Sequence, residues 1–170
     1  EKKLPADQRM DFVSIVTPNH MHFAPAKFAL ENGFHVIIDK PMTLSLAEAK
    51  KLNQVADKSG LVFALTHTYT GYPMIKEARQ LIKSGKLGKV RKVYVEYIQG
   101  WLHAPLEKTG QKQASWRSDP KKSGLGGALG DIGTHAANLA EYITGSSITE
   151  LCAELNSVVP GRLLDDDDMM

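Results

Sequence analysis

The first part of the chain alternates short apolar runs with longer amphipathic stretches. Runs rich in β-branched residues occupy Asp11–Thr17, Phe34–Asp39 and Leu61–Thr66, and they predict three buried strands. Between them, Pro25–Asn32 and Leu46–Ser59 repeat apolar residues at helical spacing and each stops at a glycine, which predicts two helices. Strands that alternate with helices in this way predict an α/β fold with a doubly wound parallel sheet.

The pattern changes in the second part of the chain. Tyr72–Ser84 and Ile132–Thr144 again show helical spacing. Val90–Gln99 and Ser147–Val158 instead alternate apolar and polar residues, as strands do when one face of an antiparallel sheet is solvated. The polar, irregular stretch Gly100–Ser123 predicts a functional loop. This part therefore predicts the start of an α+β domain with an open, mostly antiparallel sheet.

Composition narrows the class of protein. Of the 170 residues, 42% are apolar and 24% are charged, as in an ordinary soluble globular protein. The net charge of +2 comes from interleaved acids and bases, so we expect neither a nucleic-acid nor a membrane partner. Cys152 is the single cysteine, which fits a reducing compartment, and we expect a cytoplasmic location. No apolar run is long enough to span a bilayer, and Glu1 does not begin a signal-peptide pattern.

Two segments carry groups suited to proton transfer. Lys40 directly follows an apolar strand and is held rigidly by Pro41, although a solvated loop lysine is the plainer alternative. Asp131 and His135 stand at i and i+4 after a run of glycines, so a helix would present them on one face as acid/base partners. Their plainer alternatives are a first-turn acid and a packed helix histidine. All three side chains could meet in one cleft.

Three further polar segments are candidates for ligand contacts. Thr17-Pro18-Asn19 follows the carboxyl end of a strand, where open α/β sheets bind ligands, although Asn19 could simply cap the next helix. Trp116-Arg117 offers an indole and a guanidinium to a cofactor or substrate, or else anchors a long loop. Asp165–Asp168 could suggest a cation site, but like charges in a row are usually solvated, so we expect no metal.

In their order and spacing, these motifs resemble those of the Gfo/Idh/MocA oxidoreductases, named for glucose–fructose oxidoreductase and inositol dehydrogenase. The matching segments are Thr17-Pro18-Asn19-His20-Met21-His22, Asp39-Lys40-Pro41, Tyr69-Thr70-Gly71-Tyr72-Pro73, Ser84-Gly85-Lys86-Leu87-Gly88, Trp116-Arg117 and Gly126-Gly127-Ala128-Leu129-Gly130-Asp131-Ile132-Gly133-Thr134-His135. Two departures stand out. Asp39 stands where the family more often has Glu, and no G-x-G-x-x-G precedes Asp11.

The resemblance implies a division into two domains. Residues 1–68 would be the C-terminal part of a dinucleotide-binding Rossmann domain, and residues 69–170 the first part of an α+β domain for substrate binding and oligomerisation. The sheet of the second domain would pair subunits into a homo-oligomer. The chain is expected to be a fragment that lacks the N-terminal glycine-rich turn and the C-terminal part, and to be inactive by itself.

The resemblance also implies a reaction. The parent protein would transfer hydride between NAD or NADP and a secondary hydroxyl of a small sugar, polyol or related compound. In that mechanism His135 removes the hydroxyl proton, Lys40 holds and polarises the oxygen, and Asp131 balances the local positive charge. An NAD-dependent glycosidase and a non-catalytic dinucleotide-binding regulator are the alternatives. The motifs distinguish neither the substrate nor NAD from NADP, because the acidic or basic residue that reads the ribose would follow the glycine-rich turn.

The cofactor contacts implied by the resemblance come from three of the motifs. They are Thr17, Pro18, Asn19, His22, Asp39, Lys40, Pro41, Trp116 and Arg117.

Overall fold

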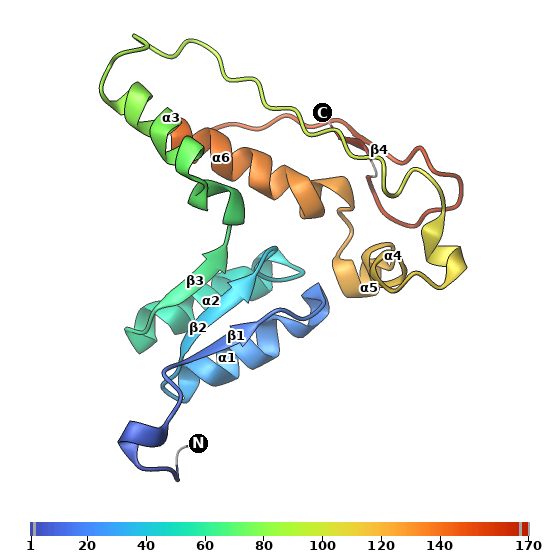
Figure 1. Ribbon diagram of the computed structural model, residues 1–170. Helices are drawn as coiled ribbons and strands as arrows, with labels where there is room; N and C mark the ends of the chain where they lie inside the picture. The colour runs from blue at the N-terminus through green and yellow to red at the C-terminus, as the bar shows by residue number, and fades with distance from the viewer. Residues whose placement is uncertain (2, 167, 170) are drawn as a thin grey trace. The chain divides into compact units, whose positions relative to one another are not determined.

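The computed structural model describes the whole chain except residues 2, 167 and 170 (Figure 1). The chain divides into two compact units, Glu1–Thr66 and His67–Met170.

Three parallel strands form the sheet of the first unit, in the order β1-β2-β3. The strands are β1 (Phe12–Ile15), β2 (His35–Asp39) and β3 (Phe63–Thr66), and the helices between them are α1 (Phe23–Glu31) and α2 (Leu46–Ser59). Short 3-10 turns lie at Ala6–Gln8 and Asn19–Met21. The predicted parallel α/β sheet is therefore confirmed, with element ends shifted by a few residues at most.

Alternate residues of β2 carry the core of this unit. Val36 and Ile38 are fully buried, and they pack with Leu30 of α1 and Leu52 of α2. Burial of each such aliphatic side chain contributes about 1.5–3 kcal/mol relative to an exposed one. The two helices also pack against each other, because consecutive right-handed crossovers place them on the same face of the sheet.

Helix α2 has the bounds that the sequence predicts because both of its ends carry strong local signals. Ser45 is the N-cap, and its hydroxyl accepts a hydrogen bond from the backbone N–H of Glu48 at 3.2 Å. Ser at the N-cap and Glu three residues later form the capping-box pattern. Gly60 ends the helix in the left-handed region at φ 64°, which costs glycine no Cβ clash.

Two neighbouring helices, α3 (Pro73–Lys83) and α6 (Thr134–Thr144), are the longest described in the second unit (Figure 1). They pack against each other, and the Arg79 guanidinium lies 4.4 Å from the ring centroid of Tyr142 and donates to its backbone carbonyl. Among the described residues, no helix combines the length and apolar character that a membrane span requires. The remaining elements are 3-10 turns at Thr68–Gly71 and Leu106–Thr109, helices α4 (Lys112–Arg117) and α5 (Pro120–Ser123), a π-helix at Leu129–Gly133, and strands β4 (Leu155–Asn156) and β5 (Asp168–Met169).

The prediction of two strands in this unit is wrong for most of their length. Val90–Gln99 is extended but pairs with no strand among the described residues (Figure 1). Of Ser147–Val158, Leu155–Asn156 alone forms a ladder, with Asp168–Met169. Alternating polarity fits a strand only where a neighbouring strand supplies hydrogen bonds, and both faces of these segments are exposed, including Tyr94 at 77%. The predicted open sheet is therefore reduced here to one two-residue ladder.

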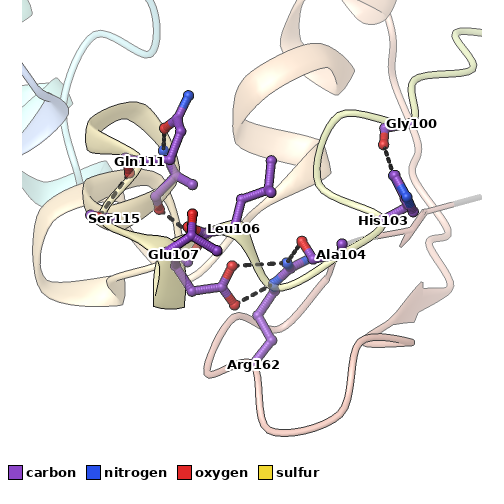
Figure 2. A network of polar contacts seen from close by, with 11 residues as sticks. Gly100, His103, Ala104, Leu106, Glu107, Gln111, Ser115 and Arg162 are labelled. Atoms are coloured by element: carbon purple, nitrogen blue, oxygen red, sulfur yellow. Dashed lines mark hydrogen bonds and ion pairs between the residues drawn. The ribbon is translucent and has the colours of Figure 1, made fainter.

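The irregular loop predicted at Gly100–Ser123 instead contains three short helical segments, and a buried arginine fixes the first of them. The Arg162 guanidinium is fully buried and pairs with the Glu107 carboxylate at 3.2 Å. It also donates to the Ala104 carbonyl at 3.4 Å, as Figure 2 shows. Burial by itself would raise the pKa of Glu107, but the hydrogen bond from Arg162, a backbone hydrogen bond and the charges of Arg162 and Lys108 together lower that pKa below 4.5.

Removal of the Glu107 charge should destabilise the chain. We expect Glu107→Gln to lower the free energy of unfolding by about 3 kcal/mol, because it leaves a buried guanidinium without its anion. Denaturant unfolding at neutral pH measures this loss. Since folding lowers the pKa of Glu107, its contribution is present above pH 4.5 and is lost as the pH falls through the lowered value, so the difference from wild type should shrink in acid.

An exposed ion pair provides the matched control. Lys27 and Glu31 lie 2.6 Å apart at i and i+4 on α1, with Glu31 46% exposed. Glu31→Gln should cost only about 0.3–0.5 kcal/mol. Equal losses from Glu31→Gln and Glu107→Gln would contradict the role given to Arg162.

Candidate functional site

The carboxyl edge of the parallel sheet collects the candidate residues of the first unit. Ile15 of β1 is the register partner of Ile38 of β2, so both strands end at the same edge. The segments that follow them contain Thr17, Pro18, Lys40 and Pro41, all half-buried. Ligands of open α/β sheets bind at this edge, which is therefore the candidate cofactor site of this unit. The predicted contacts Thr17, Pro18, Asn19, Asp39, Lys40 and Pro41 all lie here.

Asp39 and Asn19 are each fixed by their surroundings. Asp39 is the register partner of Thr66 on β3, and the Thr66 hydroxyl donates to its carboxylate. Asn19 is 7% exposed and begins the 3-10 turn that leads into α1. The N-cap positions of this turn and of α1 are occupied by Pro18 and His22.

His22 joins the two segments at this edge. Its side chain is fully buried, with Nδ1 2.8 Å from the Pro41 carbonyl oxygen and Nε2 2.8 Å from the Thr17 carbonyl oxygen. Which nitrogen donates depends on the tautomer. Both ring nitrogens are thus engaged by the backbone, and the ring bridges the segments that follow β1 and β2. The cofactor contact expected of His22 stays a prediction.

The second unit places His135 among aromatic rings. His135 lies in the first turn of α6 and is 6% exposed. Its ring centroid is 4.5 Å from that of Tyr69 and 5.5 Å from that of His67, which meets it edge-on. Neither Tyr69 nor His67 has a role that was predicted from the sequence. Tyr69 lies in a family motif, but its contact with His135 joins residues far apart in the sequence, so no local pattern could reveal it.

The Asp131 carboxylate is held by an arginine rather than by a helix cap. Arg117 Nη1 lies 3.0 Å from Asp131 Oδ1, and its guanidinium stacks 4.4 Å from the centroid of the Trp116 ring. The predicted cofactor contact of Trp116-Arg117 thus has a second explanation, because the pair orients Asp131. Asp131 lies in the π-helix and His135 in α6, so they do not share one regular helix as predicted.

The expectation of a solvated acidic run is wrong for one of its members. Asp166 is fully buried, and its two carboxylate oxygens accept hydrogen bonds from the backbone N–H groups of Gly127 and Leu129 at 2.8 and 2.6 Å. Asp165 is exposed, and Asp167 lies outside the described residues. Within the part of the chain that the structure describes, no group of three or more His, Cys, Asp or Glu could hold a metal ion.

The ionisation of Tyr69 is perturbed by its neighbours in this cluster. The Tyr69 and Tyr97 hydroxyls lie 3.5 Å apart. This hydrogen bond, then burial, then the neighbouring Tyr97, Tyr72 and Asp131 charges raise the pKa of Tyr69 to about 12. Tyr69 therefore presents a neutral phenol beside the His135 ring at any physiological pH.

Comparisons with known proteins match both parts of the chain. Residues 1–67 match an oxidoreductase family with an NAD-binding Rossmann fold, and residues 75–170 match the GFO/IDH/MocA C-terminal domain. The chain is 32% identical over 154 residues to the uncharacterized oxidoreductase YfiI of Bacillus subtilis, an alignment that covers 90% of this chain and 39% of YfiI. It is 31% identical over 158 residues to levoglucosan dehydrogenase of Pseudarthrobacter phenanthrenivorans, covering 93% and 39%.

A solved structure agrees with these matches. The crystal structure of an inositol dehydrogenase homolog complexed with NAD+ from Azotobacter vinelandii has a TM-score of 0.85 at 36% identity, covering 90% of this chain and 39% of that one. The chain thus spans 39% of the length of each of these three proteins.

The raised pKa of Tyr69 predicts a late tyrosine ionisation. Ultraviolet titration of the folded chain should show one phenol ionising near pH 12, and Tyr69→Phe should remove that step. Because folding raises this pKa from 10.0, the contribution to stability is complete below pH 10 and is lost as the pH rises towards 12. Tyr94→Phe removes an exposed phenol outside the contact and is the control. Persistence of the late step in Tyr69→Phe would refute the assignment.

Proposed function

Because the chain belongs to the GFO/IDH/MocA oxidoreductase family, whose N-terminal domain is an NAD-binding Rossmann fold, we propose that the whole protein is an NAD(P)-dependent dehydrogenase of a sugar or polyol. It would transfer hydride between the nicotinamide and a secondary hydroxyl. The observation that carries this proposal is the retention of Lys40 after β2 and of Asp131 and His135 around α6, in a chain that matches both family domains.

The carboxyl edge of the first unit suits a dinucleotide. It combines the ends of parallel strands with a carboxylate at Asp39, a cation at Lys40 and the buried amide of Asn19. Thr17, Pro18, Asn19, Asp39, Lys40 and Pro41 would hold the cofactor, and Trp116 and Arg117 are the contacts proposed from the second unit. When bound, the cofactor would accept or supply the hydride, and the chain's own residues would position the substrate and move the proton.

We assign the protein's share of the reaction to three side chains. The Lys40 ammonium would donate a hydrogen bond to the reacting oxygen, holding and polarising it. His135 would take the hydroxyl proton, a role that imidazole suits near neutral pH. Asp131, oriented by its ion pair with Arg117, would balance the positive charge that the imidazole gains. Tyr69 would fix the His135 ring by packing against it.

The names of two relatives support a proposal for the substrate class. Levoglucosan dehydrogenase and the inositol dehydrogenase homolog are named for compounds with several secondary hydroxyl groups. We infer a small polyhydroxylated substrate for this protein, and a homo-oligomer formed through the sheet of the second domain. Both NAD and NADP remain in the proposal, since the residues that would read the ribose 2′ position lie outside the matched motifs.

A product assay tests the proposed reaction. The full-length protein should reduce NAD or NADP when supplied with levoglucosan or myo-inositol as probes, with one nicotinamide reduced per alcohol oxidised. An aryl glycoside should not be cleaved under the same conditions. Glycoside cleavage without net cofactor reduction would replace the dehydrogenase with the glycosidase alternative, and cofactor binding without either reaction would favour the regulator.

Replacement of Lys40 tests the catalytic assignment. In the full-length enzyme, Lys40→Ala should lower kcat by about 10²–10⁴-fold and change the Kd for the cofactor far less. The reason is that the lysine acts on the reacting oxygen of the substrate. Steady-state kinetics and calorimetric titration measure the two quantities. Lys50→Ala, at an exposed position on α2, is the matched control. A Lys40→Ala kcat within about threefold of wild type, or roughly 0.65 kcal/mol, would refute this role.

A further inference from the structure

The acidic run near residue 166 contains a side chain that holds the candidate catalytic loop. We propose that Asp166 is a positioning residue, which fixes the glycine-rich segment Gly126–Gly130 and through it Asp131 and His135. This inference rests on the proposed function, because it takes Asp131 and His135 as the groups that act on the substrate. All of the contacts that carry it lie within the second unit.

The Asp166 carboxylate is aimed at the backbone of this segment. It is fully buried, and one oxygen accepts from Gly127 N–H at 2.8 Å while the other accepts from Leu129 N–H at 2.6 Å. Bonds from backbone N–H groups to a carboxylate are roughly twice as strong as those between neutral groups. A buried carboxylate also carries a high desolvation cost unless it is hydrogen-bonded. The two N–H groups and the carboxylate therefore depend on each other for their placement.

Backbone contacts extend this attachment on both sides. The Asp165 N–H donates to the Leu125 carbonyl at 3.0 Å, and Gly126 and Asp166 form an isolated parallel bridge. The approach is so close that a Cβ at Gly127 would lie 2.1 Å from the Asp166 carbonyl oxygen and 2.9 Å from a methyl carbon of Leu164. Glycine at 127 is therefore required by the contact itself, whereas a Cβ added at Gly130 would meet nothing within 4 Å.

The attached segment leads directly to the candidate catalytic groups. The Gly127 carbonyl accepts from Asp131 N–H at 3.0 Å, so the residue that Asp166 holds in turn holds the backbone of Asp131. The Asp131 carboxylate then meets Arg117 at 3.0 Å. The π-helix that starts at Leu129 continues into α6, which carries His135 in its first turn. Release of the Asp166 anchor would thus loosen the start of this π-helix.

Substitution in the full-length, NAD-loaded protein tests the inference. Asp166→Asn keeps the shape but turns one acceptor into an N–H donor facing a backbone N–H. We expect hydrogen–deuterium exchange of residues 126–135 to rise at least tenfold, with exchange of α2 unchanged. With levoglucosan or myo-inositol as probe, kcat should fall at least tenfold while the Kd for NAD stays within twofold. Asp165→Asn, at the exposed neighbour, should change neither quantity.

A second variant guards against a folding defect in Asp166→Asn. Gly127→Ala introduces the Cβ that collides with the Asp166 backbone, and it should raise the same exchange and lower kcat in the same way. Gly100→Ala, where a Cβ meets nothing within 4 Å, is its control. Unchanged exchange at 126–135 in a folded variant would overturn the inference, as would faster exchange with kcat unchanged. If the wild-type protein turns over neither probe, the proposed function fails, and exchange alone decides whether Asp166 holds the segment.

Discussion

A polar side chain that is removed from water must find hydrogen-bond partners, and in this chain those partners lie in the loops that carry the candidate chemistry. His22 reaches the carbonyls of the segments that follow β1 and β2. Arg162 reaches Glu107 and Ala104, and Asp166 reaches the glycine-rich segment. Each of the three is buried, so displacement of its loop would leave a buried polar group without these hydrogen bonds, which costs free energy. The loops are therefore held by satisfied polar groups rather than by apolar packing alone.

This kind of attachment suits loops that must be both exposed and rigid. A loop that presents Lys40 or Asp131 to a ligand cannot be covered by an apolar layer, because that layer would also cover the functional group. A buried side chain that binds the loop's backbone from behind fixes the geometry and leaves the front accessible. Catalysis by positioning needs errors well below an ångström, so such anchors matter to the reaction even though they touch no substrate.

The sequence predicted those parts of the fold that local signals determine. The three strands, α1 and α2 follow from apolar periodicity and from caps such as Ser45 and Gly60, all within a few neighbouring residues. The predictions failed where the deciding partner is distant. Val90–Gln99 has the alternation of a strand, but its neighbour in a ladder cannot be read from its own residues. Likewise, Asp166 looked like a solvated acid, because its burial and its backbone partners are set by tertiary structure. The ion pair of Arg117 with Asp131 was missed for the same reason.

The same distinction explains why the candidate residues could be found although their supports could not. Lys40, Asp131 and His135 stand in short motifs, where residue type and spacing are visible in the sequence. Their supports are His22, Asp166, Arg117 and Tyr69. Each of these side chains contacts a residue that lies at least 14 positions away in the sequence. A motif therefore identifies the group that performs the chemistry, while the fold determines whether that group is held still enough to perform it. Of these supports, His22 lies in the first unit, and Asp166, Arg117 and Tyr69 lie in the second.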